Sequence, residues 1–393
     1  MVTDSSANSG KNGKYDKFTG EKFTVVHVTN YYFPTLGGIT TQVYYLVKHF
    51  AQRGIESKVI HFPLIFRQIT NLFYFKPLKR IIHFLFVFFF VVFAVMQVLF
   101  YRITKGRLVV HSHDAYFCAL VGIISKLFGC RSIHIMRTTF EYRSRPSFKW
   151  IQTLIFNSCD LLTFVSHFML NEFRKTFPKV KTSGRVTYSG IDAEKFHLVH
   201  KDKLIMEYLG MKGPFLLFVG NLIPGKDPML LVDIVKAVKK KYPNIVMLII
   251  GDGYLKTQIA RRIAREELQD NIFLVGEVPR DKILQYYRLA DIYVMPTLME
   301  ALGNSVMEAM ATGKPVVASN VGGIKEIIES REYGLLVHPQ NPAEFSNAIL
   351  HLLSNQKLMK GMSKKSIKRI QKKFSWRAIS QSYLNCYTEA LEK

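Results

Sequence analysis

The sequence predicts an α/β protein with two domains, each built around a parallel β-sheet. Three observations support this fold class. The chain has 393 residues, and a domain usually takes about 100–200 residues. Apolar residues make up 48% of the chain and charged residues 21%, which is typical of a globular protein and excludes a disordered one. Short apolar runs alternate with helical patterns along the chain, as they do in parallel sheets with crossover helices.

The first domain is predicted over residues 23–205. Its strand-like runs are 23–29, 57–62, 108–113, 132–136 and 161–165. Gly37 and Gly38 open the first helical pattern, an amphipathic stretch that ends near Arg53. Residues 1–22 are polar and rich in Gly, Ser and Asn, so we expect a disordered tail without the apolar region of a secretory signal.

The second domain is predicted over residues 206–375 and repeats this rhythm. Its strand-like runs are 215–220, 245–253, 273–276, 292–296, 315–319 and 334–337. The polar segment 197–213 separates the two blocks and is the predicted linker, so two Rossmann-like domains follow one another. The basic run KKSIKRIQKK at 364–373 lies in a helical pattern. It is interpreted as a solvated helix face, with a contact to lipid headgroups as the alternative.

One apolar segment, Ile81–Tyr101, departs from the soluble pattern, since only His83 and Gln97 in it are polar. As a helix it would be roughly 31 Å long, enough to cross a bilayer. A single crossing would, however, separate strands of one predicted sheet. We therefore expect a helix with its outer face in the membrane interface, or a re-entrant pair, with a buried core helix as the alternative. The expected membrane contacts, including flanking basic residues that suit anionic headgroups, are Phe84, Phe88, Phe89, Phe90, Arg80 and Arg102.

The charge balance predicts an anionic partner. Lys and Arg total 54 against 29 Asp and Glu, a net of +25, and the residues through Leu204 carry 28 and 11, a net of +17. Nucleic acid, a membrane surface and a phosphorylated substrate all fit. No nucleic-acid-binding motif is recognised, so a nucleic-acid partner is not expected and stays a remote alternative. The four cysteines have no metal-binding spacing, and no Asp-x-Asp occurs, which argues against a metal site or a disulfide scaffold.

Three loops that follow predicted strands carry candidate ligand-binding groups, because ligands bind beyond the carboxyl ends of such strands. The first contains the Gly-Gly pair, and the second, GNLIPGKDP, contains Lys226. The third, in residues 296–319, contains Glu300 and Glu308 eight residues apart, with Gly303 at a helix start whose amides suit an anion. A pair of carboxylates suits sugar hydroxyls. Each motif also has a simpler interpretation. The Gly-Gly pair would form only a tight turn, and Lys226 would be an ordinary surface lysine. Glu300 would cap the helix, and Glu308 would be solvated.

These motifs resemble those of GT-B-fold retaining glycosyltransferases, and of glycosyltransferase family 4 in particular, which includes lipid-linked sugar transferases. The resemblance rests on EALGNSVME, GNLIPGKD, the Gly-Gly loop, VTYSGIDAEKF and VASNVGGIKEII, and it spans about residues 23–390. It implies two Rossmann-like domains that face an inter-domain cleft, and a C-terminal helix over 376–393 that crosses back to the N-terminal domain.

The resemblance implies catalytic roles for Glu300, Lys226, His113 and Arg137. Glu300 would orient the donor sugar, and Lys226 would neutralise the diphosphate leaving group. Glu308 would hold the ribose hydroxyls. The implied donor-binding residues are Gly37, Gly38, Asn221, Val278, Leu302, Gly303, Asn304, Ser305 and Glu308.

Three positions depart from the family pattern. Asn221 stands where many members have arginine, so more of the diphosphate charge falls on Lys226. Leu302 replaces a phenylalanine. Arg137 stands where many members have histidine, so a donor phosphate or an anionic acceptor is its expected partner.

The resemblance thus implies metal-independent, cofactor-free, retaining transfer of a hexose or N-acetylhexosamine from a UDP- or GDP-linked sugar. The expected acceptor is a lipid or lipid-linked sugar at an anionic membrane surface, with a soluble acceptor as the alternative. Another GT-B activity, such as that of an epimerase or a phosphorylase, would need a different catalytic set. The expected location is the cytoplasm, peripherally on the cytoplasmic face of a membrane.

Overall fold

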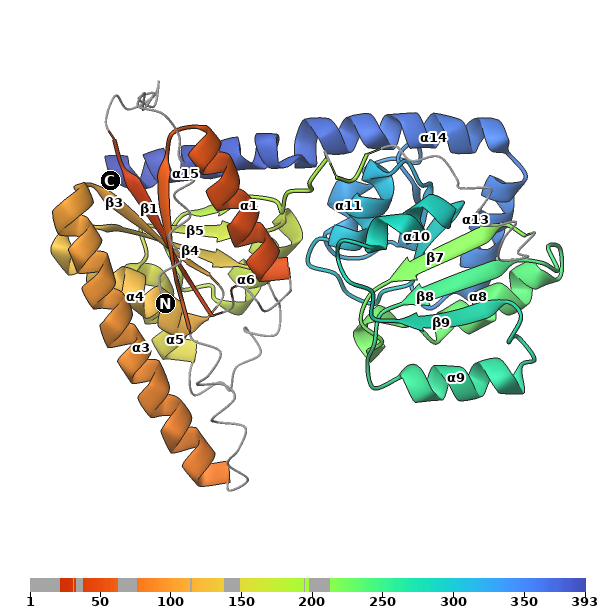
Figure 1. The fold of residues 1–393 in the computed structure, drawn as a ribbon, viewed down its shortest axis with the longest axis horizontal. Helices are drawn as coiled ribbons and strands as arrows, with labels where there is room; N and C mark the ends of the chain where they lie inside the picture. Colours follow the sequence, from red (N-terminus) through yellow and green to blue (C-terminus); the bar gives the residue numbers. More distant parts are fainter. Residues whose placement is uncertain are drawn as a thin grey trace. The chain divides into compact units, whose positions relative to one another are not determined.

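The computed structural model describes residues 22–30, 32, 38–62, 76–113, 115–137, 149–193, 195–197 and 213–393. Nearly all of the predicted tail, most of the predicted linker, and Gly37 therefore lie outside the described residues. The chain forms two compact units, each with a six-stranded parallel sheet (Figure 1). Unit 1 comprises Met1–Gly190 and Trp376–Lys393, and unit 2 comprises Ile191–Ser375. This is the α/β architecture that the sequence predicts.

The sheet of unit 1 has the strand order β2-β1-β3-β4-β5-β6. Its strands are β1 (Thr24–Thr29), β2 (Glu56–His61), β3 (Leu108–His113), β4 (Arg131–Met136), β5 (Leu161–Phe164) and β6 (Gly184–Val186). Its helices are α1 (Gly38–Gln52), α3 (Lys76–Lys105), α4 (Tyr116–Ser125) with the short η1 (Lys126–Phe128), α5 (Lys149–Ser158), α6 (His167–Thr176) and α15 (Trp376–Glu392). The sequence reading missed β6, because three residues are too short for a periodic pattern.

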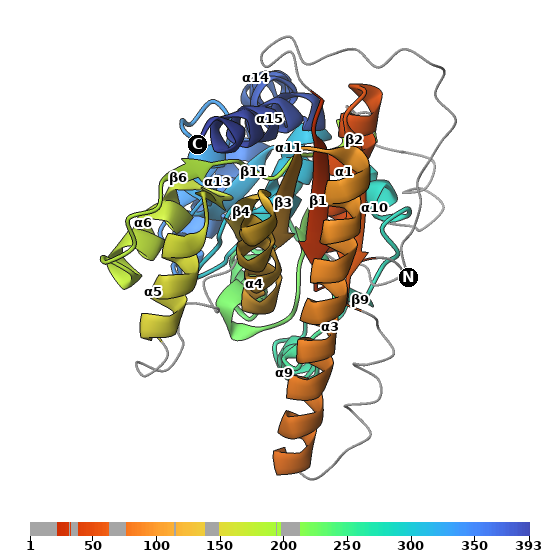
Figure 2. The same cartoon turned by 90° about the vertical axis from the view of Figure 1, so that its left-hand side faces the viewer.

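Helices cover both faces of this sheet, which is why every residue of β1, β3 and β5 is buried. In the sheet, β2 lies on one side of β1, and β3, β4 and β5 follow in order on the other side. Right-handed crossovers then place α1 on one face and α3, α4 and α5 on the opposite face. The α3, α4 and α5 helices lie side by side in Figure 2.

Helix α3 is continuous and longer than the predicted 81–101. One stripe of it, including Phe90, Ala94 and Val98, is buried in the core against β1 and β3. Phe90 is only 2% exposed and packs edge-on to Phe62, so the prediction that Phe90 contacts a membrane is wrong. The opposite stripe is exposed and consists of Ile81, Phe84, Leu85, Phe88, Phe89, Val92, Phe93, Met96, Phe100 and Ile103.

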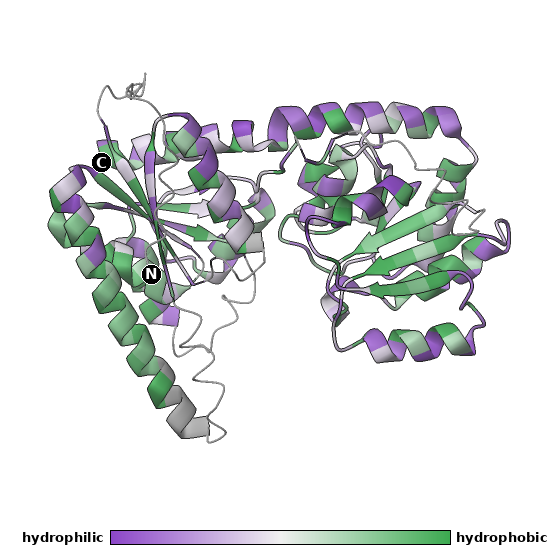
Figure 3. Ribbon diagram, in the orientation of Figure 1, coloured by the Kyte–Doolittle hydropathy of each residue, from purple (hydrophilic) through white to green (hydrophobic). Residues whose placement is uncertain are grey.

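This two-sided pattern decides between the expectations for the apolar segment. A re-entrant pair is wrong, because one unbroken helix fills the segment, and a fully buried core helix is wrong, because a whole apolar stripe is exposed. Figure 3 shows apolar residues along most of α3. Phe84–Lys105 is long and apolar enough to cross a membrane by length and composition, and 22% of its most apolar window is buried in the protein.

The C-terminal helix α15 packs on unit 1. The Tyr383 hydroxyl accepts a hydrogen bond from Gln42 Nε2 at 2.7 Å, and Arg185 forms an ion pair with Glu389. The predicted domain boundary at residue 205 lies too late in the sequence. The Ile191 amide already bonds to a carbonyl of unit 2, that of Phe374, so the chain joins unit 2 from Ile191 onward.

The sheet of unit 2 has the strand order β12-β11-β10-β7-β8-β9. Its strands are β7 (Phe215–Val219), β8 (Val246–Ile250), β9 (Ile272–Gly276), β10 (Ile292–Met295), β11 (Val316–Ser319) and β12 (Leu335–Val337). Its helices are η4 (Pro224–Lys226), α8 (Leu230–Lys239), α9 (Lys256–Arg265), α10 (Ile283–Leu289), α11 (Asn304–Ala311), α12 (Ile324–Ile327), α13 (Pro342–Leu353), α14 (Gln356–Arg369) and η5 (Ile370–Phe374). β7 pairs with both β8 and β10, so the chain reverses direction across the sheet there.

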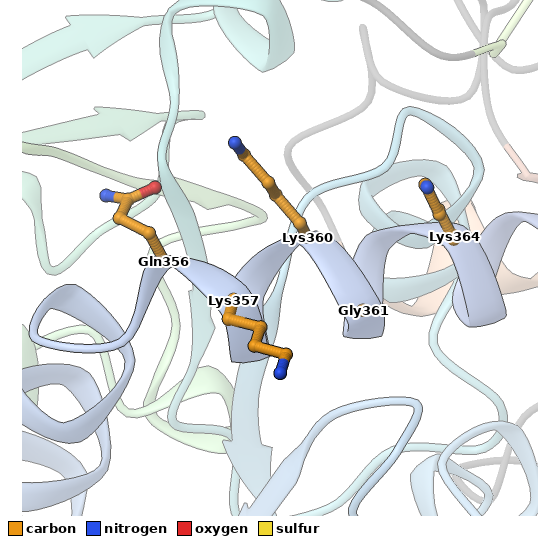
Figure 4. Close-up of a pocket in the computed structure, with 5 residues that line it drawn as sticks. All are labelled: Gln356, Lys357, Lys360, Gly361 and Lys364. Atoms are coloured by element: carbon orange, nitrogen blue, oxygen red, sulfur yellow. The ribbon is translucent and has the colours of Figure 1, made fainter.

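The basic run at 364–373 is only partly a solvated face. Arg369 is buried and donates from Nε to the Ile327 carbonyl at 2.7 Å, while Lys365 forms an ion pair with Glu332. A shallow hollow along α14 is lined by Gln356, Lys357, Lys360, Gly361 and Lys364 (Figure 4). Because a single helix supplies this lining, the hollow lacks the converging groups of a ligand site.

Candidate active site

The candidate site of unit 2 lies where its sheet reverses direction, between β7 and β10. Parallel strands end at the same edge of the sheet, and the loops after two strands that diverge in this way leave room for a ligand. The loop after β7 carries Asn221 and Lys226, and the loop after β10 carries Glu300. Two motifs far apart in the sequence therefore meet at one place.

Lys226 and Glu300 form a direct ion pair, in which Lys226 Nζ donates to Glu300 Oε2. Their side chains are 22% and 15% exposed, so both reach the surface of unit 2. The two loops are held together by the Gly225 carbonyl, which accepts from Thr297 Oγ1 at 2.8 Å and from the Leu298 amide at 2.9 Å. An ammonium and a carboxylate are thus fixed side by side at the edge of the sheet.

The start of α11 lies directly after this loop. Gly303 precedes the helix with φ 109°, a conformation that favours glycine. The side chain of Leu302 is buried, while Asn304 is exposed. The first amides of a helix lack partners within it and carry partial positive charge, so the start of α11 can add hydrogen bonds to an anion held near Glu300.

The loop of Glu300 rests on Gly322 and Gly323. The Gly323 amide donates to the Glu300 carbonyl at 2.9 Å. A Cβ added at Gly322, where φ is +50°, would lie 2.1 Å from the same carbonyl oxygen. The close approach of these backbones therefore requires glycine, which explains the Gly-Gly pair of VASNVGG in physical terms.

We expect Gly322→Ala to displace the Glu300 loop, because the clash is with backbone and cannot be relieved by a rotamer change. The expected result is a loss of about 1–3 kcal/mol of stability together with a fall in transfer activity. Urea unfolding and initial rates would measure the two effects. The matched control is Gly361→Ala on α14, where nothing lies within 4 Å of the new Cβ. A Gly322→Ala enzyme with unchanged stability and rate would contradict this role.

Glu308 lies inside unit 2 and is already engaged. Its Oε2 accepts from the Tyr287 hydroxyl at 3.0 Å, and its Oε1 lies 3.5 Å from Arg280. Burial raises the pKa of the Glu308 carboxyl, while Arg280 and Tyr287 oppose this shift. Arg280 and Tyr287 were not among the predicted site residues. The basic residue of GEVPR, two positions after Val278, was the available signal for Arg280.

The other predicted donor-binding residues of unit 2 follow the same edge of the sheet. Asn221 is exposed after β7, and Val278 is partly buried after β9. The Ser305 hydroxyl accepts from Tyr293 at 2.7 Å. None of these three takes part in the Lys226–Glu300 hydrogen bond.

The edge of unit 1 carries the remaining predicted catalytic residues. Arg137 follows β4, and its guanidinium donates to His113 Nδ1 at 2.7 Å. Because arginine only donates, His113 Nε2 carries the proton and donates to His27 Nδ1 at 3.0 Å. His113 is fully buried, so the expectation that it contacts substrate is corrected: it positions Arg137. Gly38 begins α1.

Four buried histidines lie in or beside this chain of hydrogen bonds: His27 and His113 belong to it, and His111 and His134 are next to it. Burial lowers the pKa of His27 and of His134 to about 3, and it holds the pKa of His111 and His113 well below the usual value. All four imidazoles are therefore neutral at pH 7. Coulombic repulsion from the Arg137 guanidinium lowers these pKa values further.

His27, His111 and His113 lie close enough together to ligate a metal ion. The hydrogen bond from Arg137 opposes such a role. A metal at His113 Nε2 needs a lone pair on that atom, whereas donation from Arg137 to Nδ1 leaves the proton on Nε2. The adjacent guanidinium also repels a cation. The cluster fits a hydrogen-bonding network better than a metal site.

Comparisons with known proteins define the class. The Glycosyltransferase Family 4 model matches residues 36–195, and the Glycosyl transferases group 1 model matches residues 206–369. Together the two models cover most of the chain. The fold and these matches define a nucleotide-sugar glycosyltransferase of the GT-B fold. The chain is a glycosyltransferase that carries a family 4 domain followed by a group 1 domain.

The relatives agree with this assignment. An uncharacterised glycosyltransferase of Methanocaldococcus jannaschii is 26% identical over 383 residues, which cover 91% of this chain and 96% of that protein. A D-inositol 3-phosphate glycosyltransferase of Corynebacterium efficiens is 33% identical over 179 residues, only 44% of this chain and 42% of that protein. The crystal structure of Anabaena Alr3699/HepE in complex with UDP has the same fold, with a TM-score of 0.72 at 16% identity over 93% of this chain and 99% of that one.

Proposed function

We propose that this chain is a retaining glycosyltransferase that moves a hexose or an N-acetylhexosamine from a UDP- or GDP-linked sugar to a lipid or lipid-linked acceptor. The observation that carries the acceptor class is the exposed apolar stripe of α3, which lies within the region matched by the family 4 model. Soluble proteins rarely expose so long a row of large apolar side chains without a partner. The UDP complex of the Anabaena protein supports a nucleotide donor.

The proposed mechanism uses fixed charge in place of a metal ion. As the bond from the anomeric carbon to the diphosphate breaks, negative charge grows on the leaving oxygen. The Lys226 ammonium and the first amides of α11 stabilise this charge. The Glu300 carboxylate accepts hydrogen bonds from donor-sugar hydroxyls once Lys226 turns to the diphosphate. The acceptor hydroxyl then attacks the anomeric carbon on the face that the diphosphate leaves, which retains the configuration, and its proton passes to the leaving diphosphate oxygen.

The proposed location is the cytoplasmic face of a membrane, with peripheral attachment through α3. β1 pairs with β2, which precedes α3, and with β3, which follows it. A membrane-spanning α3 would place these paired strands on opposite sides of the bilayer. The helix therefore lies on the bilayer and inserts only its exposed stripe.

The test is a transfer assay with purified protein, UDP- and GDP-linked sugars, and anionic vesicles that contain a lipid extract. We expect a radiolabelled sugar to appear in the organic phase and to do so in the presence of EDTA. We expect Phe88→Gln/Phe89→Gln, which changes two exposed side chains of α3, to reduce vesicle flotation and lipid transfer about tenfold. Its donor hydrolysis should stay unchanged, because the donor site lies in unit 2.

The control is Tyr254→Gln, which removes an aromatic ring of similar exposure from unit 2. It should float and transfer like the original protein. Transfer to a soluble acceptor alone would overturn the lipid class, and loss of activity in EDTA would overturn the metal-independent mechanism.

A further inference from the structure

A second apolar face lies on α5, in the same unit as α3. Trp150, Ile151 and Leu154 are all exposed, Trp150 by 64%. Their spacing of one and four residues places them on one side of the helix. The other side, with Ile155 and Phe156, is buried against the unit.

The α4 and η1 helices fill the space between α3 and α5. Arg102 at the end of α3 donates from Nε to the Phe128 carbonyl of η1 at 3.1 Å. Lys126 of η1 donates to the Ser158 carbonyl at the end of α5 at 2.9 Å. The three elements therefore form one layer over the sheet, seen face-on in Figure 2. Arg102 thus ties α3 to η1 and is not only the headgroup contact that the sequence suggested.

Apolar side chains continue across this layer. Leu127 of η1 is 82% exposed, and Phe128 and Leu120 beside it are also exposed. The surface ends at the next helix, α6, where His167, Asn171 and Lys175 are the exposed residues. The apolar area is therefore bounded by a polar helix.

The charges of the layer favour an anionic partner. The sequences of α3, α4, η1 and α5 contain no aspartate or glutamate. Lysines lie at its ends: Lys149 at the start of α5 is exposed, and Lys105 at the end of α3 forms an ion pair with Glu56 at 3.0 Å. Apolar helix faces with basic ends and an exposed tryptophan match a bilayer interface, where an indole ring lies at the headgroup level.

We propose that α3, η1 and α5 form one docking surface for an anionic lipid bilayer, with Trp150 as an anchor at the headgroup level. This surface, defined by the α3 stripe, Leu127 and the Trp150 face, places the sheet of unit 1 parallel to the membrane. The proposal rests on the membrane attachment through α3 proposed above and adds α5 as a second contact. Two contacts with the bilayer, one through α3 and one through α5, fix the tilt of unit 1 relative to the membrane plane. A single helix leaves the unit free to rotate about the helix axis.

The test uses the fluorescence of the full chain, which has two tryptophans. Trp376 is 2% exposed and supplies a constant background. We expect phosphatidylglycerol vesicles brominated at carbons 6 and 7 of the acyl chain to quench Trp150 more strongly than vesicles brominated at carbons 11 and 12. The Trp150→Phe variant should lose the quenched component. Leu154→Glu should lower the partition coefficient about fivefold, while Asn171→Glu on the polar α6 should have a smaller effect.

Each outcome separates the two proposals. Flotation without quenching of Trp150 would overturn the α5 contact and leave the attachment through α3 intact. No flotation at all would overturn both. A lipid-free dimer whose formation is abolished by Leu154→Glu would show that a second copy of the chain covers this surface, which would also overturn the proposal.

Discussion

Replacing Lys226 with methionine is expected to lower kcat for sugar transfer by about 10²- to 10³-fold, the cost of removing one fixed group that stabilises developing charge. Methionine keeps most of the side-chain length and removes only the charge. Asn221 in the same loop carries no charge, so Lys226 is the cation that the loop 220–228 offers to the diphosphate. Release of UDP or GDP from the nucleotide sugar would measure the effect, with kcat and KM determined separately.

Glu300→Gln is the companion variant at the same site. It keeps the shape of the side chain and removes the charge that pairs with Lys226. We expect a fall on the order of 10²-fold in kcat, because one of the two carboxylate oxygens that accept from the donor sugar becomes an amide donor. The double variant should lose less than the product of the two single effects, since the residues contact each other.

The matched control for Lys226 is Lys236→Met. Lys236 is an exposed lysine of α8 that forms an ion pair with Glu266, so the same charge is lost at a different place. This variant should retain the original kcat. Near-original rates in both Lys226→Met and Glu300→Gln, with normal unfolding curves, would remove these residues from the mechanism.

The second large effect is a loss of stability in acid. The pKa of His27 and of His134 is about 3 in the folded protein, against about 6.5 in an unfolded chain. Between about pH 3 and pH 6.5 these two histidines bind protons only in the unfolded state. The free energy of unfolding is therefore unaffected by them above about pH 6.5 and falls as the pH decreases below that value. At pH 5 each histidine costs about 2 kcal/mol. His111 and His113 act in the same direction.

A loss of this size is a large share of the roughly 5–15 kcal/mol that stabilises a typical domain. We therefore expect unit 1 to unfold as the pH falls toward about 5. Both tryptophans, Trp150 and Trp376, belong to unit 1, so tryptophan fluorescence in urea would follow this unit alone. The midpoint concentration of urea should fall steeply between pH 7 and pH 5.

Two variants test whether the buried histidines cause this loss. His134→Asn keeps a donor for Ser112, to which His134 is hydrogen-bonded, and removes one titrating group. It should reduce the slope of stability against pH by about 1.4 kcal/mol per pH unit. His338→Asn, in unit 2 and exposed, should leave the curve of unit 1 unchanged. A curve that is flat from pH 7 to pH 5 would contradict the neutral histidine cluster.

The sequence was sufficient where the physical signal is local. The β3 strand was predicted at 108–113 and is found there, because a short apolar run with two β-branched valines follows Gly106 and Arg107 and favours a strand. Lys226 and Glu300 were predicted because glycine-rich loops after buried strands are where parallel sheets bind ligands. Tyr287 was missed, since no local pattern distinguishes a tyrosine that contacts Glu308 from any other tyrosine.

The sequence by itself determined two parallel α/β domains, an apolar helix and the loops that carry the candidate site. Only the tertiary structure decided how these parts are used. It paired Lys226 with Glu300 through a reversal of strand order, and it buried His113 beneath Arg137. It also determined which stripe of α3 is buried. A helix that is apolar on all sides has no periodic pattern in its sequence, so only the elements that pack against it determine which face is covered.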